Sequence, residues 1–184
     1  FMSSIKASTA IDVYGKSKAV AELKLQALNN HEMAIVIVRP CMMYGPGVKG
    51  SFNSLAKVLR KNWPLPFGLI SKNKRSVLSI VNLISFVKHL LDNKLEGVFS
   101  LSDGEPISTR EMVSAMRKGL NSKSMLIPVP TVFFSVAGRV LNKQEVISRL
   151  IGDLEVPIME TKNKTGWIPT QSSVELIEQF LRSE

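Results

Sequence analysis

The sequence predicts an α/β protein built around a parallel sheet. Helical and strand-like patterns alternate along the chain, as they do in β/α proteins. The run Ala-Ile-Val-Ile-Val at 34–38 is rich in β-branched residues and uninterrupted, which is typical of a parallel strand buried on both faces. With 184 residues, 45% of them hydrophobic, the chain can bury one good core. No apolar stretch reaches the roughly 18 residues needed to span a bilayer, so the composition indicates a soluble protein.

The first expected helix runs from Val13 to Leu28, because apolar residues recur there at helical spacing. Prolines pin the loop at 62–68 in an extended form. Two helices are expected to begin with capping boxes, Ser108 with Glu111 and Ser172 with Glu175. The remaining expected elements are strands at 34–38, 77–81, 98–101 and 126–129 and helices at 52–61, 82–92, 132–141 and 145–150.

Tyr14 and Lys18 are the most informative pair, because they stand four residues apart at the head of the first helix. Side chains at i and i+4 share one helical face. A Lys charge beside a Tyr hydroxyl favours the phenolate and lowers a phenol pKa that is ordinarily about 10. With a hydroxyl from Ser3 or Ser4, the pair suits proton transfer coupled to hydride transfer at a secondary carbinol. The alternative interpretation is an exposed Tyr on a basic helical face.

Five features in order span nearly the whole chain. They are the Ser3-Ser4 strand end, Tyr14-Gly15-Lys16-Ser17-Lys18, the turn from Arg39-Pro40 to Tyr44-Gly45-Pro46-Gly47, the stretch around Arg75, and Thr165-Gly166-Trp167. Together they resemble the C-terminal part of extended short-chain dehydrogenases/reductases, the family of UDP-galactose 4-epimerases and nucleotide-sugar dehydratases and 4-ketoreductases.

The resemblance implies a Rossmann-type doubly wound parallel sheet with a smaller α/β substrate-binding domain. Residues 1–47 would form the last portion of the dinucleotide-binding domain. Residues 48–184 would mainly form the nucleotide-sugar-binding domain, with about 77–92 returning to the Rossmann sheet.

The family's glycine-rich nucleotide fingerprint does not occur in this sequence. It would lie in the turn from the first strand to the first helix, where backbone amides receive the pyrophosphate. The chain also begins at Phe1, and its first residues are expected to be the end of an interior strand. We therefore expect the C-terminal portion of a larger enzyme, inactive and unable to hold NAD tightly by itself. The short distance from Ser4 to Tyr14 indicates residues missing between about Ala7 and Ile11.

The resemblance also implies residue roles around the reacting carbon. Tyr14 would be the general acid/base at the sugar O4, and Lys18 would tune it and bind the nicotinamide ribose of NAD or NADP. Ser4 would be the catalytic hydroxyl, with Ser3 as the alternative. Pro40 would make backbone contacts to the nicotinamide, besides ending its strand.

A second implied set of residues would bind the nucleotide part of a UDP-sugar. Arg75 would grip the diphosphate through two parallel hydrogen bonds. Leu65 and Phe67 would pack against the uracil ring. Ser51 and Phe52 would open the substrate helix, although Ser51 stands where relatives often carry Asn. The alternatives are a solvated Arg75 and a loop that packs onto its own domain.

The expected activity is that of an NAD(P)-dependent nucleotide-sugar 4-epimerase or 4-ketoreductase in surface polysaccharide or nucleotide-sugar metabolism. Met42 stands where galactose-type epimerases have Asn. The stretches at 47–53, 64–68 and 101–105 look closest to the bacterial branch that acts on UDP-N-acetylated hexosamines, and a UDP-hexose stays open. The alternative is a non-catalytic nucleotide-binding or scaffolding protein of the same fold.

The net charge of +9 does not indicate nucleic acid, because the basic residues are scattered and no aromatic-interleaved stripe accompanies them. Binding of pyrophosphate ligands would explain part of the excess of positive charge. Cys41 is the single cysteine, which rules out an internal disulfide and fits the cytoplasm. His31 and His89 lack metal-ligand spacing, so no metal site is expected. The expected partner is a UDP-sugar, with no membrane and with a homodimer left open.

Overall fold

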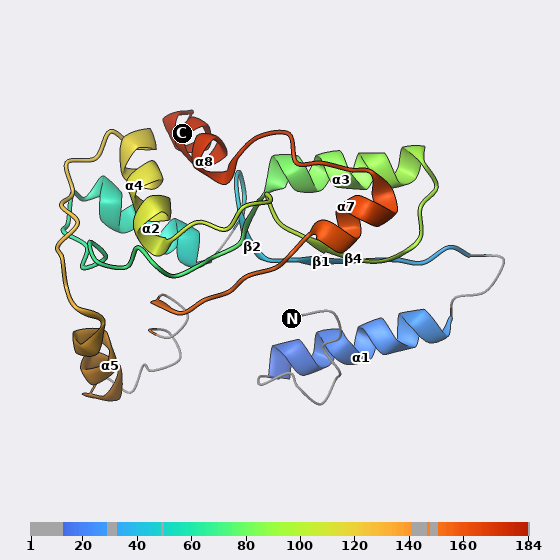
Figure 1. The fold of residues 1–184 in the computed structure, drawn as a ribbon, viewed down its shortest axis with the longest axis horizontal. Coiled ribbons are helices and arrows are strands. Elements are labelled where there is room, and N and C mark those ends of the chain that lie inside the picture. The colour runs from blue at the N-terminus through green and yellow to red at the C-terminus, as the bar shows by residue number, and fades with distance from the viewer. Residues whose placement is uncertain (1–12, 29–32, 49, 141–146, 148–150, 184) are drawn as a thin grey trace.

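The computed structural model describes residues 13–28, 33–48, 50–140, 147 and 151–183 (Figure 1). Its elements in chain order are α1 (Val13–Ala27), β1 (Val36–Pro40), β2 (Met42–Tyr44), α2 (Ser51–Arg60), β3 (Val77–Ser79), α3 (Ile80–Asp92), β4 (Gly97–Leu101), α4 (Thr109–Gly119), α5 (Thr131–Val140), α7 (Met159–Thr165) and α8 (Ser173–Arg182).

Two pairs of parallel strands form the centre of the molecule. β1 pairs with β4, in a register that runs from Val36 opposite Gly97 to Pro40 opposite Leu101, and β2 pairs with β3. A single residue, Cys41, separates β1 from β2, and its amide donates to the Leu101 carbonyl at 3.2 Å. The Asp103 amide, two residues after β4, donates to the Val77 carbonyl of β3 at 2.8 Å, so hydrogen bonding continues from one strand pair to the next.

Helices lie on both sides of the β1–β4 pair: α1 on one side, α3 and α7 on the other (Figure 1). The parallel strands confirm the expected α/β class. β3 runs directly into α3, and Ser79 caps that helix by accepting a hydrogen bond from the Val81 amide at 3.0 Å. This cap ends the strand at Ser79, two residues before the expected end.

The apolar side chains gather in two cores. The larger core lies among α2, α4 and α8, and Gly119 lets α4 approach α8, because a Cβ there would stand 2.8 Å from the Glu178 carbonyl oxygen. The smaller core lies under α3, where Phe86 is fully buried and meets Phe99 and Trp167 edge-on at 5.6 and 5.1 Å.

Most expected elements are confirmed to within two residues, with some differences. The strand expected at 126–129 is a single bridge between Leu126 and Leu65. β2 and α7 were not expected, because each is too short to show its own periodicity. The expected helix at 145–150 lies almost entirely outside the described residues.

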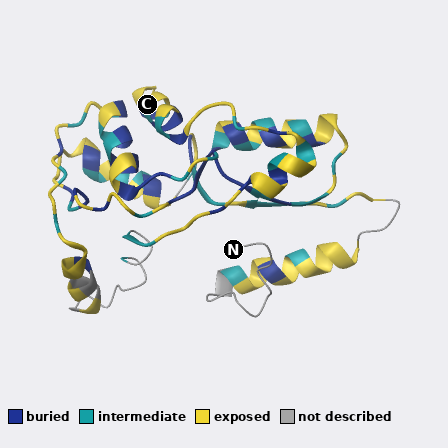
Figure 2. Ribbon diagram, viewed as in Figure 1, coloured by how far each residue is buried: buried dark blue, intermediate teal, exposed yellow. Residues whose placement is uncertain are grey.

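The expected burial of the first strand on both faces is wrong. Val36 is 38% exposed and residues 37–39 are only half-buried. Within the described part of the chain, β1 pairs with β4 alone, so one strand edge has no neighbour. The apolar stripe of α1 is also mostly exposed, with Ala19 buried but Val20, Leu23 and Leu28 open (Figure 2).

Across the described ranges, every helix is too short or too polar to cross a bilayer.

The capping box of α4 provides a test of local stability. Ser108 Oγ accepts from the Glu111 amide at 3.1 Å, and the Glu111 carboxylate accepts from the Ser108 amide at 2.7 Å. We expect Ser108→Ala to lower the free energy of unfolding in urea by about 1 kcal/mol, the usual cost of losing an N-cap hydroxyl. Ser71→Ala, in an exposed loop, is the matched control.

The same box predicts a pH dependence. Hydrogen bonds from the Ser108 backbone and then from its side chain hold the pKa of Glu111 below the usual value. A carboxyl group with a lowered pKa stabilises the fold above its unfolded pKa of about 4.3, and this stabilisation is lost as the pH falls. The difference between the parent and Ser108→Ala should therefore shrink in acid. A difference that grows in acid would contradict this assignment.

Candidate functional site

The first part of the candidate site lies at the start of α1. Helical backbone begins at Val13, so Tyr14 lies in the first turn and Lys18 follows one turn later. The Lys18 side chain is exposed. The side chain of Tyr14 and the whole of Ser4 and Ser3 lie outside the described residues, so their approach to Lys18 stays a prediction.

An ion pair joins α1 to β1. The Arg39 guanidinium contacts both carboxylate oxygens of Glu22, with Nε at 3.1 Å from Oε2 and Nη2 against Oε1. Such two-pronged contacts between Arg and a carboxylate are geometrically specific. They hold the helix that carries Tyr14 beside the strand end that carries Pro40. No sequence motif predicted this ion pair, although a charged residue next to the end of an apolar strand was an available signal.

Pro40 is exposed at the carboxyl end of β1, opposite Leu101 of β4. Ligands of open parallel sheets bind outside the carboxyl ends of the strands. Further along, Ser51 is exposed as the first residue of α2, and its Oγ lies 3.4 Å from the sulfur of Met42. Met42 and Ser51, two of the positions expected to depart from the family pattern, are therefore in contact with each other.

Arg75 is only 6% exposed, so it is not the solvated side chain of the alternative interpretation. Its backbone exchanges two hydrogen bonds with Ile107, at 2.8 and 3.0 Å, and its guanidinium Nη1 donates to the Gly152 carbonyl at 3.1 Å. Burial lowers the pKa of Arg75, and the nearby Asp153 carboxylate opposes this shift. The structure therefore brings Arg75 between the start of α4 and the segment at 152–154.

The apolar residues expected near a uracil ring are buried in the protein itself. Phe67 stacks on Phe134 of α5 with ring centroids 6.0 Å apart. Phe52, which was expected to open the substrate helix, is buried too and stacks on Tyr44 at 5.2 Å. Leu65 is likewise buried. In the same loop Trp63 stays exposed. The loop packs onto its own domain, as in the alternative interpretation, and a ligand contact by its side chains stays a prediction.

A buried polar cluster beside the strand ends was not found from the sequence. The Asp103 carboxylate accepts from the Tyr44 hydroxyl at 2.8 Å, from the Ser79 amide at 2.9 Å and from the Asn82 amide group at 2.7 Å. Asn82 in turn accepts from Thr170 Oγ1 at 2.9 Å. This Asp103 cluster ties β2, β3 and α3 to the C-terminal segment.

The titration of the Asp103 cluster follows from its burial. Burial raises the pKa of Asp103, and the three hydrogen bonds that it accepts oppose the rise. Burial and then the Asp103 charge raise the pKa of Tyr44. Tyr44 is therefore a hydrogen-bond donor to Asp103 and is unsuited to act as a base.

Two other groups are not candidates for chemistry. Burial raises the pKa of the Cys41 thiol to about 12, so it is not a nucleophile near neutrality. His89 of α3 makes a 2.8 Å hydrogen bond with the Thr165 carbonyl. In the part of the chain that the structure describes, no three His, Cys, Asp or Glu side chains group together as metal ligands.

No family model matches the sequence. The chain is 41% identical over 171 residues to UDP-glucose 4-epimerase of Vibrio cholerae, covering 91% of this chain and 52% of that protein. It is also 26% identical to a 3beta-hydroxysteroid dehydrogenase/Delta(5)-Delta(4) isomerase 1 of Caenorhabditis elegans, covering 91% of this chain and 41% of that protein. The chain thus spans about half the length of the curated relatives that it matches.

Solved structures share the fold. UDP-galactose 4-epimerase superposes with a TM-score of 0.67 at 14% identity, covering 94% of this chain and 53% of that one. The Bordetella bronchiseptica enzyme WbmG in complex with NAD superposes with a TM-score of 0.64 at 18% identity, covering 91% and 48%. The expected Rossmann-type fold is therefore confirmed.

Proposed function

Because the chain belongs to the NAD-dependent epimerase/dehydratase family of extended short-chain dehydrogenases/reductases, we propose that the protein is a nucleotide-sugar 4-epimerase. The observation that carries this proposal is the 41% identity to UDP-glucose 4-epimerase across 91% of the chain. Within the proposal, this chain supplies the acid/base helix and most of the sugar-nucleotide site.

The described residues fit the nicotinamide end of NAD or NADP. Lys18 is exposed on α1, Pro40 is exposed at the carboxyl end of β1, and the pair of Arg39 with Glu22 joins these two elements. In the proposal, Lys18 binds the nicotinamide ribose and the Pro40 backbone contacts the ring. When bound, the cofactor supplies reversible hydride transfer.

Tyr14 is the proposed group for proton transfer. In the proposal its phenolate would take the proton of the sugar O4 while the C4 hydride would pass to bound NAD or NADP, which yields a 4-keto sugar. Returning the proton to O4 and the hydride to the opposite face of C4 gives the epimer. Lys18 favours the phenolate by its charge, and Ser4 holds O4 in place. An unassisted phenol with a pKa of about 10 would be protonated near neutrality.

For the substrate we propose a UDP-N-acetylhexosamine, with a UDP-hexose as the second choice. The support is Met42, a thioether at the position where galactose-type epimerases would carry Asn, together with its contact to the small hydroxyl of Ser51. A thioether offers apolar surface that suits an acetyl methyl group. Arg75 would bind the diphosphate.

Turnover of the full-length protein tests the proposal. It is incubated with NAD and UDP-N-acetylglucosamine, and separately with UDP-glucose, and the C4 epimers are separated by chromatography. Appearance of either epimer supports the epimerase. A third incubation holds a UDP-4-keto sugar with NADH or NADPH. Reduction of this keto sugar without epimerisation of either UDP-sugar would replace the epimerase by a 4-ketoreductase. Binding of UDP-sugars without any turnover would favour a non-catalytic protein.

Arg75 gives a separate prediction. We expect Arg75→Ala in the full-length protein to weaken UDP binding by about 1.5 to 3 kcal/mol, the range for hydrogen bonds to charged groups, and to leave NAD affinity unchanged. Isothermal titration with each ligand measures this. Lys72→Ala, which removes an exposed charge from the same loop, is the control. Because Arg75 also holds the Gly152 carbonyl, equal losses for UDP and NAD would assign it to the fold alone.

A further inference from the structure

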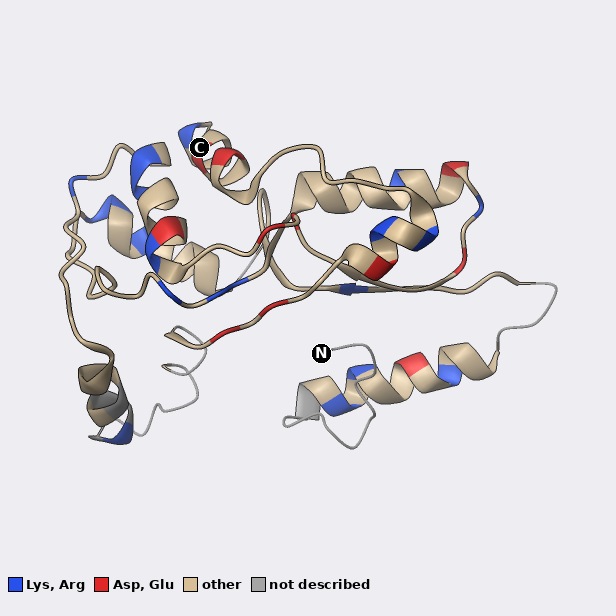
Figure 3. Ribbon diagram, viewed as in Figure 1, with Lys and Arg blue, Asp and Glu red and all other residues tan. Residues whose placement is uncertain are grey.

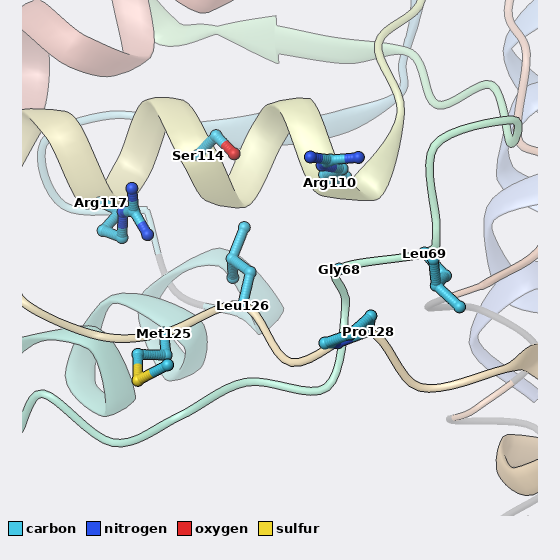
Figure 4. A pocket seen from close by; sticks show the side chains of 8 residues that line it. All are labelled: Gly68, Leu69, Arg110, Ser114, Arg117, Met125, Leu126 and Pro128. Atoms are coloured by element: carbon cyan, nitrogen blue, oxygen red, sulfur yellow. The ribbon is translucent and has the colours of Figure 1, made fainter.

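A cavity of about 540 Å³ lies between α4 and the segments at 68–69 and 125–128. This volume is typical of small-molecule sites. Figure 4 shows Arg110, Ser114 and Arg117 along α4, with Leu126 and Pro128 on the segment that faces it. The cavity therefore has one polar wall and one apolar wall.

The polar wall follows from helix geometry. Arg110, Ser114 and Arg117 stand at i, i+4 and i+7, so they share one face of α4. At 1.5 Å per residue the two arginines are about 10 Å apart along the axis, with the serine hydroxyl between them. Arg117 Nη1 donates to the Ser124 carbonyl at 3.1 Å, which directs this side chain toward the 125–128 segment.

The opposite wall is fixed by backbone contacts. Gly68 donates to the Ile127 carbonyl at 2.9 Å, and a Cβ at Gly68 would stand 2.8 Å from the Leu126 carbonyl oxygen. The Arg110 amide donates to the Ile70 carbonyl at 2.9 Å. The walls of the cavity are therefore fixed before any ligand binds, and a ligand would not have to order them.

The charge of the cavity is positive. Among the described residues, its lining holds two guanidinium groups and no carboxylate, and no Asp or Glu forms an ion pair with Arg110 or Arg117. α4 carries one acidic residue, Glu111, whose carboxylate accepts from the Ser108 amide in the capping box. The other described Asp and Glu residues lie on other elements and loops (Figure 3). Arginines without a carboxylate partner in a concave site attract anions and suit phosphate above all.

We propose that this cavity, the α4 pocket, binds a phosphorylated small molecule. Its phosphate oxygens would accept from Arg110, Ser114 and Arg117, and its apolar or planar part would lie against Leu126 and Pro128. The three donor groups are spread along two helical turns, so a single carboxylate cannot accept hydrogen bonds from all of them. A diphosphate has enough oxygens to do so. Because the proposed function assigns the diphosphate of the UDP-sugar to Arg75, the ligand of the α4 pocket is a separate phosphorylated metabolite.

Pyrophosphate and UDP are the probes, titrated calorimetrically into the full-length protein. Arg110→Gln is the test variant, because the Arg110 side chain is exposed and its loss should leave the melting temperature unchanged. Lys57→Gln, on the exposed face of α2, removes the same charge elsewhere and is the control. We expect Arg110→Gln to weaken pyrophosphate binding about tenfold, because one charge-assisted hydrogen bond is lost. Lys57→Gln should bind pyrophosphate with nearly the affinity of the parent.

The outcomes separate the proposal from its rivals. The titration is repeated with saturating UDP-sugar, which fills the proposed substrate site. Pyrophosphate should then still bind at the α4 pocket, and loss of all pyrophosphate binding would overturn the proposal because it would show binding at the substrate site only. Parent-like binding by Arg110→Gln overturns the proposal, as does the absence of pyrophosphate binding at millimolar concentration. Equal weakening by Lys57→Gln also overturns it, because it would show only a general effect of net charge. None of these results depends on turnover, so they stand apart from the epimerase assay.

Discussion

Replacing Tyr14 by Phe in the full-length protein is expected to lower turnover of the UDP-sugar by about a hundredfold or more, the scale of a lost general acid/base. Binding of the UDP-sugar should be nearly unchanged, because the ring stays and only the hydroxyl is lost. Steady-state kinetics and calorimetry on the same preparation measure both effects. Turnover within about threefold of the parent would contradict the role of Tyr14.

Lys18→Met is the companion variant. Lys18 would both tune the phenol and bind the ribose, so its loss should weaken the cofactor and slow the chemistry together. Lys16→Met, an exposed lysine in the same turn of α1, is the matched control. Unchanged cofactor affinity in Lys18→Met would show that Lys18 is a surface charge only.

The largest effect on stability is expected at Asp103. Asp103→Ala leaves the Tyr44 hydroxyl, the Ser79 amide and the Asn82 amide group without their acceptor. Each buried donor without a partner costs about 1 to 3 kcal/mol. Since burial of the carboxylate is itself unfavourable and offsets part of this, we expect a loss of about 3 to 5 kcal/mol in the free energy of unfolding. Urea unfolding followed by circular dichroism measures it.

Tyr44→Phe is the control for Asp103→Ala. It removes one donor and leaves the carboxylate with the Ser79 amide and the Asn82 amide group, so its cost should be about 1 kcal/mol. A smaller loss for Asp103→Ala than for Tyr44→Phe would mean that the cluster relaxes and that water replaces the carboxylate.

Local sequence patterns determined the parts of this protein that depend on neighbouring residues. The capping boxes at Ser108 and Ser172 are confirmed because a cap involves only residues within one turn. The helical spacing of Tyr14 and Lys18 follows in the same way, since i and i+4 share a face in any α-helix. The family assignment came from motif order, which also needs no tertiary contact.

Only the tertiary structure decided which polar groups meet across long separations in the chain. Asp103 meets Tyr44 across 59 residues, and Arg75 meets the Gly152 carbonyl across 77. No local pattern indicated that Phe67 stacks on Phe134 of α5. The α4 pocket combines a helix face with two distant segments. Periodicity is a local property, whereas such contacts depend on how the chain folds back on itself, and no local pattern encodes that.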